Sequence, residues 1–314
     1  MRPLVPRLTV PLLLKLHRWI AIALSPVLLL LTLSGAILAF KPVADDAHRV
    51  AVDVPALVSA LEQADPQGRA GTLSIAPDGK TFTLASRRDG PTGVFDMATG
   101  ARRGEAGFDV FEAMRRLHVN LMVGADWLVT LGTVAMVALI VSGLLFNWRS
   151  LRNTLSGWHV GMGWLSLPLM ALTPVTGLLM AFHLGMSPLP RYAGTAHPLP
   201  LAQVLHIAGE QTDLGKLMRV RNFRRGGVML SVQRAGVSPA TYIVAGTGQF
   251  VRMDEAGWVR MLHIGNWAGA YSGVLTFLST LPLFGLLFTG LLAWWRRRGR
   301  LTKRAPLDAV RANA

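Results

Sequence analysis

Four histidines lie near the start of four long apolar stretches, a position where an imidazole could bind a metal inside a membrane. These histidines are His17, His118, His159 and His263. Near its other end each stretch carries a small hydroxyl residue before glycine, followed by an aromatic residue; these pairs are Ser34-Gly35, Ser142-Gly143, Thr176-Gly177 and Thr289-Gly290. Imidazole is an axial ligand of haem iron, and glycine lets a flat group approach the backbone closely. The pattern therefore favours haem ligation.

The spacing of these residues indicates an internal duplication with a period of about 143 residues. Proline and glycine follow His17 at nine and eighteen residues, and they follow His159 at the same offsets. Eighteen residues make five helical turns, so each of these histidines shares a helix face with its glycine. His118 likewise pairs with His263. The repeating unit is a helix, a polar segment and a second helix, which predicts a parallel repeat about an axis along the membrane normal.

The duplication places the histidines at two depths. His17 and His159 should lie together near one face of the membrane, and His118 and His263 near the other. Two pairs of imidazoles predict two bis-histidine haems of the b type. The glycines of the second and fourth stretches, Gly143 and Gly290, should lie near the first haem, and Gly35 and Gly177 near the second. No catalytic residue can be named from the sequence.

Simpler roles remain open for the same residues. A histidine at a helix end can bond to lipid headgroups or water, and small residues can merely allow close helix packing. His183 ends the third stretch and either replaces a ligand of the second pair or binds at a third site, although its repeat counterpart is Lys41. We expect surface or loop roles for the remaining histidines, His48, His197 and His206.

Composition places the chain in a membrane. Of its 314 residues, 51% are hydrophobic and only 16% are charged, against about 25% charged in soluble domains. The net charge of +15 lies mostly beside the apolar stretches, so the positive-inside rule explains it better than nucleic-acid binding does. The absence of cysteine excludes disulfides, thiolate metal sites and haem attached through cysteine (c-type). No acidic residue lies in the apolar cores, which argues against an ion-coupled transporter.

We expect a mainly α-helical membrane protein, a bundle of four transmembrane helices with two small α+β domains on the outer side. Helical spacing is found at 53–62 and 202–209, strand patterns occur at 72–75, 81–85, 227–233 and 241–245, and 93–100 has the pattern of a strand, a turn and a strand. Positive short segments predict that both termini are cytoplasmic. The predicted parts are the N-terminus and first helix (1–40), first outer domain (41–116), second helix (117–148), cytoplasmic loop (149–157), third helix (158–183), second outer domain (184–260), fourth helix (261–295) and basic tail (296–314).

The helices resemble the PepSY-associated transmembrane helix family. The residues that carry the likeness are Leu16-His-Arg-Trp19 with 33–40, Leu117-His118 with 142–148, and Leu262-His263 with 289–298. The outer segments look like small PepSY-type domains. The resemblance implies a multi-pass protein of a bacterial inner membrane that is tied to iron uptake, and some members look like haem-containing reductases of ferric siderophores.

The sequence and the resemblance together favour a transmembrane haem-dependent ferric reductase. Its expected partners are the lipid bilayer, a cytoplasmic or membrane electron donor, and a periplasmic ferric chelate or siderophore. Arginines of the first outer segment could attract an anionic chelate or form a solvated face; they are Arg102, Arg103, Arg115 and Arg116. Two alternatives stay open: a membrane-anchored peptidase regulator with structural histidines, and a small transporter.

Overall fold

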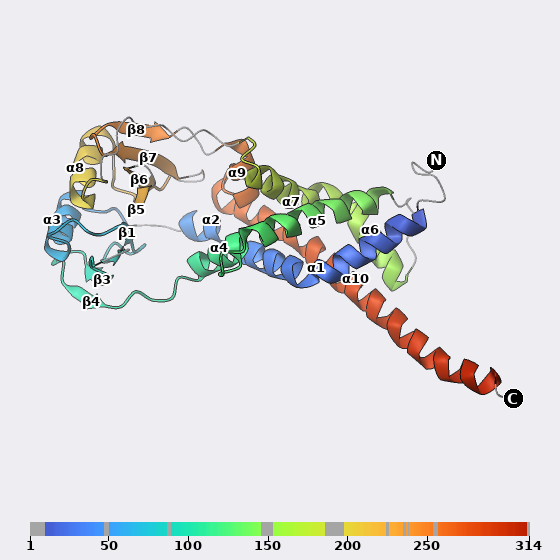
Figure 1. Cartoon of the computed structure of the whole chain (residues 1–314). Coiled ribbons are helices and arrows are strands. Elements are labelled where there is room, and N and C mark those ends of the chain that lie inside the picture. Colours follow the sequence, from blue (N-terminus) through green and yellow to red (C-terminus); the bar gives the residue numbers. More distant parts are fainter. Residues whose placement is uncertain are drawn as a thin grey trace.

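The molecule is an elongated helical bundle with a β-sheet domain at one end (Figure 1). The computed structural model describes residues 10–46, 50–86, 89–145, 153–185, 198–223, 226–234, 237, 239–253 and 257–312, with side chains except at 46 and from 299 onward. Helix α1 begins and helix α10 ends at the end of the bundle far from the sheet (Figure 1). His48 and His197 lie outside the described residues.

The bundle consists of helices that are apolar enough to cross a membrane. Three qualify alone: α1 (Val10–Leu38) continued by α2 (Lys41–Asp46), α5 (Asp126–Leu145), and α10 (Gly269–Ala312) up to Arg298. The pair α6 (Leu155–Leu165) and α7 (Leu167–Ala181) makes a fourth if it is counted as one span. Large apolar side chains of α5 such as Val141 stay exposed, as expected of a surface that faces lipid. The chain is therefore a multi-pass membrane protein.

The third predicted helix, 158–183, is broken in the structure. Helices α6 and α7 meet at an angle of 70° at Ser166. Pro168 occupies the first turn of α7 and has no backbone N–H to continue the hydrogen bonds of α6, which explains the break. Its counterpart Pro26 lies inside the unbroken helix α1, so the two halves differ here.

The predicted single helices 117–148 and 261–295 are also wrong in detail. Helix α4 (Val110–Asn120) precedes α5, and α9 (Trp258–Ile264) precedes α10. Leu121 and Met122 end α4 with positive φ, and Gly265 ends α9 at φ +69°, where an added Cβ would lie 2.1 Å from the Thr276 hydroxyl oxygen. His118 and His263 therefore sit on short separate helices, and counting helical turns from them to Gly143 or Gly290 has no meaning.

The outer segments form one sheet instead of two separate domains. Its eight antiparallel strands run in the order β4-β3-β2-β1-β5-β6-β7-β8. The central pair joins the segments, with Leu73 opposite Val220. Pairing satisfies the backbone groups that β1 and β5 would expose as edges of two smaller sheets. The strands are β1 (Thr72–Ile75), β2 (Thr81–Ala85), β3 (Gly93–Asp96), β4 (Arg102–Gly104), β5 (Leu217–Phe223), β6 (Gly227–Val232), β7 (Ala240–Ala245) and β8 (Phe250–Met253).

Two helices cover one face of this sheet and supply its core. They are α3 (Val54–Ala64) and α8 (Leu201–Gln211), and they lie beside each other on the side away from the bundle (Figure 1). Leu57 and Leu205 from these helices are fully buried against Phe82 and Val220 of the strands. Asp53 caps α3 by accepting a hydrogen bond from the Ala56 amide. On the opposite face the neighbouring strands β2, β1 and β5 carry the polar side chains of Thr83, Ser74 and Arg219.

The two halves of the chain have the same order of elements in the sheet domain: one helix followed by four strands. In each half, bundle helices precede and follow this unit. The strands predicted at 72–75 and 81–85 are confirmed, and the elements predicted at 53–62, 202–209, 227–233 and 241–245 are confirmed with ends shifted by one or two residues. Of the strand, turn and strand predicted at 93–100, the first strand and the turn are confirmed, and the second strand lies further on as β4. Strands β5 and β8 were not predicted, because arginines interrupt their apolar residues.

Candidate functional site

The structure brings the four histidines predicted as metal ligands together as two pairs. His118 of α4 and His263 of α9 form the sheet-end pair, with ring centroids 6.1 Å apart and ring planes at 46°. His17 of α1 and His159 of α6 form the far-end pair, with centroids 6.4 Å apart and planes at 90°. An imidazole nitrogen binds a first-row metal at about 2.0–2.1 Å, so two rings on opposite sides of one metal have centroids roughly 6.3 Å apart. Both separations match this value.

Main-chain carbonyls fix the sheet-end rings. The Nδ1 atom of His118 lies 3.1 Å from the carbonyl oxygen of Leu31, and Nδ1 of His263 lies 3.0 Å from that of Thr173. A carbonyl oxygen only accepts hydrogen bonds, so Nδ1 carries the proton in both rings. The remaining ring nitrogen, Nε2, then carries the lone pair that a metal requires.

Hydroxyl groups hold all four rings in the same way. The Nδ1 atoms of His118 and His263 contact Ser34 Oγ at 2.9 Å and Thr176 Oγ1 at 3.2 Å. Those of His17 and His159 contact Ser142 Oγ at 2.8 Å and Thr289 Oγ1 at 2.9 Å. Each hydroxyl belongs to the residue before the glycine of a repeated pair, and each lies on a helix different from that of its histidine.

The protons of these hydroxyls are already used, which settles the direction of the bonds. Ser34 and Thr176 donate to carbonyl oxygens one turn earlier in their own helices, both at 2.6 Å. Thr289 donates to Gly285 at 2.7 Å, and Ser142 donates to Leu139 at 3.0 Å. Each hydroxyl oxygen therefore accepts from the N–H of its histidine. The far-end rings thus have the same tautomer as the sheet-end rings, with the lone pair on Nε2.

Three of the four predicted glycines make room for a histidine ring. A Cβ at Gly35 would lie 3.2 Å from Cε1 of His118, and one at Gly177 would lie 2.9 Å from Cε1 of His263. A Cβ at Gly290 would lie 3.3 Å from Cε1 of His159. A Cβ at Gly143 meets nothing within 4 Å. The close approach is therefore to the imidazole itself, and Gly143 does not share this role.

A large cavity opens beside the sheet-end pair. It has a volume of about 560 Å³, and both His118 and His263 line it. Its walls are mainly apolar side chains of the bundle, and the exposed His183 lies at its edge with φ +57°. His183 thus shares this cavity without belonging to either pair. His206, by contrast, is an exposed residue of α8 that lies 3.7 Å from Glu210.

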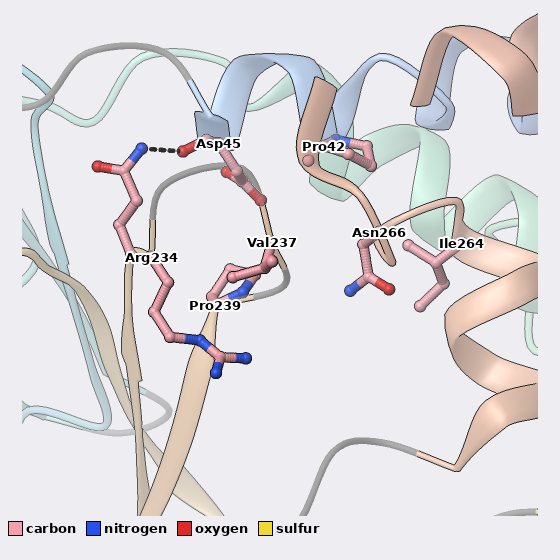
Figure 2. A pocket seen from close by; sticks show the side chains of 9 residues that line it. Pro42, Asp45, Arg234, Val237, Pro239, Ile264 and Asn266 are labelled. Carbon is pink, nitrogen blue, oxygen red and sulfur yellow. Dashed lines mark hydrogen bonds between the residues drawn. The ribbon is translucent and has the colours of Figure 1, made fainter. Parts of the chain in front are cut away.

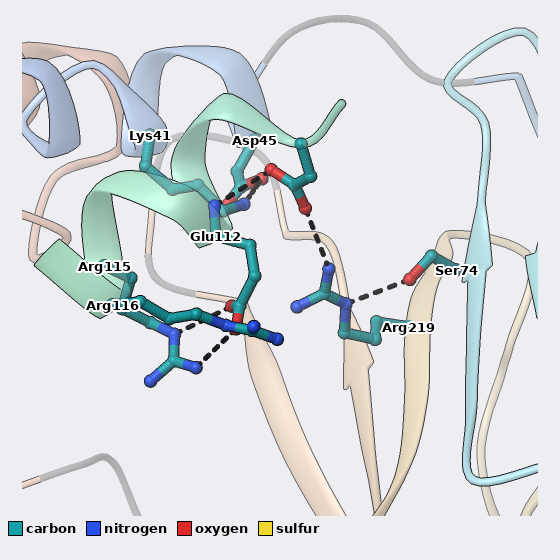
Figure 3. Close-up of polar contacts among 8 residues, drawn as sticks. Lys41, Asp45, Ser74, Glu112, Arg115, Arg116 and Arg219 are labelled. Carbon is teal, nitrogen blue, oxygen red and sulfur yellow. Dashed lines mark hydrogen bonds and ion pairs between the residues drawn. The ribbon is translucent and has the colours of Figure 1, made fainter. Parts of the chain in front are cut away.

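Charged residues of α2, α4 and β5 line the part of this cavity nearest the sheet, which we call its mouth, and Figure 3 shows their polar contacts. Glu112 of α4 accepts from Arg115 at 2.7 and 2.8 Å and from Arg116 at 3.0 Å. Hydrogen bonds from Arg115, followed by Arg116, lower the pKa of the Glu112 carboxyl to about 2, against the opposing effect of desolvation. Lys41 pairs with Asp45 across one turn of α2.

Arg219 connects the sheet domain to the mouth of this cavity. It lies on β5, donates to Ser74 Oγ at 3.0 Å and approaches Asp109 at 3.7 Å (Figure 3). Asp109 is the N-cap of α4, the helix that carries His118. The sheet domain and the sheet-end pair are therefore linked through α4. The other basic residues singled out in the sequence, Arg102 and Arg103, lie on edge strand β4 and pair with Glu105 and Asp96.

A second contact joins the sheet domain to α2. Gln233 donates to the main-chain oxygen of Asp45 at 2.7 Å, beside a small cavity of about 70 Å³ that Pro42, Pro239 and Asn266 help to line (Figure 2). A space of this size holds a few water molecules at most. We therefore assign it a structural role.

Each histidine pair offers two imidazole ligands. Within the described ranges, no group of three or more His, Cys, Asp or Glu side chains is arranged to hold a metal ion. Each pair thus offers only two ligands, fewer than the four that protein metal sites usually supply. A porphyrin provides four nitrogen ligands of its own and needs two more along its axis.

The sequence did not reveal the role of the hydroxyl residues, although the repeated Ser-Gly and Thr-Gly pairs contained the signal. Arg219 was missed because β5 was not predicted, and Arg260 was overlooked although it stands three residues before His263, as Arg115 stands before His118. The repeat alone could have identified Arg260 as the counterpart of Arg115.

A family model described as "PepSY-associated TM region" matches residues 14–297 of the chain. A search of curated proteins found no match.

Proposed function

Because the chain belongs to the family of PepSY-associated transmembrane regions, and because its buried imidazoles converge in pairs, we propose that it is a haem b electron-transfer protein of a bacterial inner membrane. It takes electrons on the cytoplasmic side and reduces a periplasmic ferric chelate, in particular a ferric siderophore. The observation that carries the proposal is the shared geometry of the two pairs. Four Nδ1–H groups are each held by an acceptor, which leaves the Nε2 lone pair of each ring for a metal, and the two rings of each pair lie 6.1 and 6.4 Å apart.

The residues present fit this group. His17 with His159, and His118 with His263, would supply the axial ligands of two haems. The cavity beside the sheet-end pair is of the size that ligand pockets for cofactors have, and apolar walls dominate it. A haem held by two imidazoles supplies one-electron chemistry at its iron.

The chain's own residues then have defined tasks. The hydroxyls and carbonyls orient the imidazoles with the proton on Nδ1, and hydrogen bonds of this kind raise the basicity of a ligand. The charged mouth at the sheet end, with Arg115 and Arg219, faces the side where an acceptor would arrive. One electron converts Fe(III) in a chelate to Fe(II), which hard oxygen ligands hold less strongly.

The architecture supports a tandem duplication in this proposal. Each His pair takes one residue from each half of the chain, and equivalent bonds hold equivalent residues: His118 with Ser34 and Leu31, and His263 with Thr176 and Thr173. We place the far-end pair on the cytoplasmic side, together with both termini, and the sheet domain in the periplasm. The basic residues after Trp295 agree with this orientation.

Absorption spectroscopy tests the proposal. The protein purified from haem-replete cells should show a Soret band that shifts when dithionite is added, and pyridine haemochrome analysis should give about two haems per chain. The dithionite-reduced protein should be reoxidised when it is mixed with a ferric chelate. A colourless preparation from haem-replete cells would contradict the proposal and favour the peptidase-regulator or transporter alternatives.

A further inference from the structure

A group of arginines gathers above the sheet-end pair, from two parts of the molecule. Arg219 and Arg221 are two residues apart on β5, and Val220 between them is fully buried in the core against α3 and α8. Side chains alternate along a strand, so both arginines project from the opposite face, on which Arg219 contacts the N-cap of α4. This face of β5 is therefore turned toward the bundle.

The bundle contributes two arginines in equivalent places. Arg115 precedes His118 by three residues on α4, and Arg260 precedes His263 by three residues on α9. Three residues are close to one helical turn, so each arginine lies one turn from the histidine of its helix. Arg115 also lines the cavity that both histidines line.

The charge of Arg221 interacts with those of the other three arginines, and the charge of Arg260 interacts with that of Arg115. Desolvation, followed by the charges of Arg219, Arg260 and Arg115, lowers the pKa of Arg221. Desolvation, followed by the charge of Arg115, lowers the pKa of Arg260. Both side chains nevertheless remain accessible to solvent. They are thus reachable by a ligand while protein atoms surround much of each.

The carboxylates nearby neutralise only part of this charge. Glu112 forms ion pairs with Arg115 and Arg116, and Asp109 forms one with Arg219. Arg221 and Arg260 make no ion pair with a carboxylate in the part of the chain that the structure describes; Arg221 instead contacts the sulfur of Met229 at 3.6 Å. Arg102 and Arg103, at the sheet edge, each have their own carboxylate. The arginine group therefore differs from an ordinary solvated surface.

We infer that Arg115, Arg219, Arg221 and Arg260 form the docking site for a ferric chelate that carries several negative charges. This inference rests on the proposed function and adds the substrate class. Guanidinium groups bind carboxylate and phenolate oxygens with strong, directed hydrogen bonds. Arg115 and Arg219 belong both to this group and to the cavity wall, so an anion bound here lies at the mouth beside the sheet-end pair.

Gallium(III) chelates test the inference without any redox step. The full chain in neutral detergent is dialysed against a gallium tris-catecholate, which carries three negative charges, and in parallel against an uncharged gallium tris-hydroxamate. Bound gallium is measured by mass spectrometry. We expect the anionic chelate to bind more tightly, and its binding to weaken as salt is raised. Equal binding of the two chelates, or no binding of the anionic one, would overturn the inference.

Substitutions locate the site. Arg221→Gln and Arg260→Gln should each weaken binding of the tris-catecholate about tenfold, because each removes a charged hydrogen bond, whereas Arg221→Lys and Arg260→Lys should retain part of the affinity. Arg102→Gln is the matched control and should have no effect. Unchanged affinity for the tris-catecholate in both glutamine variants contradicts the inference. The inference also fails if these variants lose haem while their affinity for the chelate stays unchanged. If protein purified from haem-replete cells contains no haem but still binds the gallium tris-catecholate, the docking site stands and only the haem proposal is refuted.

Discussion

Replacing Gly177 with alanine should displace one imidazole of the sheet-end pair. The new Cβ would lie 2.9 Å from Cε1 and 3.5 Å from Nδ1 of His263, and 3.8 Å from a methyl carbon of Thr133. Ordinary contact begins at 3.4 Å, so the ring or helix α7 must move by about 0.5 Å. That movement strains the bonds from Nδ1 to Thr173 and Thr176, which are 3.0 and 3.2 Å long.

Steric and helical effects oppose each other in this variant. Forcing an extra methyl group into a packed site typically costs about 1–3 kcal/mol, whereas alanine is favoured over glycine within a helix by about 1 kcal/mol. Gly143→Ala is the matched control, because it lies in helix α5 with nothing within 4 Å of the new Cβ. This control should gain about 0.5–1 kcal/mol of stability without disturbing a histidine.

Haem content and Tm separate the two variants. We expect Gly177→Ala to retain about one haem of two, or to show an altered low-spin signal for one haem by electron paramagnetic resonance. Gly143→Ala should keep both haems and an unchanged or higher Tm. The reasoning is refuted if Gly177→Ala keeps two haems with an unaltered spectrum, or if the two variants lose haem equally.

Three further predictions follow from other contacts. Ser34→Ala should weaken haem retention at the sheet-end pair about tenfold in a dilution assay, because His118 then keeps only its bond to the Leu31 carbonyl. The control Ser25→Ala should leave haem retention unchanged, because the Ser25 hydroxyl bonds a carbonyl of its own helix. Equal haem retention in the two variants would contradict this prediction. Because the pKa of Glu112 is lowered, its ion pairs stabilise the fold fully above the ordinary carboxyl pKa of 4.5, and this stabilisation is lost as the pH falls toward 2. Between pH 4.5 and 2 the Tm of Glu112→Gln should therefore decline less than that of the unaltered protein. An equal decline of Tm in the two proteins would exclude this role. Green fluorescent protein fused after Ala314 should fluoresce and alkaline phosphatase fused there should be inactive; the reverse pattern would invert the topology.

The pairing of the histidines could be predicted because it follows from a repeat that is visible in the sequence. His17 and His159 share offsets to proline and glycine, and the structure brings these two rings together. The hydrogen-bond partners could not be predicted in this way. His17 bonds Ser142, which lies 125 residues away on another helix, and only tertiary packing decides which helix faces which.

The shape of the sheet domain depends on the same kind of long-range choice. Each segment shows its own helix and several of its own strands, so two small domains are the natural reading. Whether β1 and β5 stay as edges or pair with each other is decided by the energy of unpaired backbone groups, which leaves no local mark in the sequence. Strand β5 hides its pattern because Arg219 and Arg221 occupy its alternate positions, and these residues join the candidate docking site.

Haem stoichiometry in double histidine variants tests the central claim most directly. If the two pairs are the haem ligands, His17→Ala with His159→Ala should lose one haem and keep the other, and His118→Ala with His263→Ala should do the same. His17→Ala with His118→Ala, which damages both pairs, should lose both haems. Equal haem content in the same-pair and cross-pair variants, at equal Tm, would contradict the account.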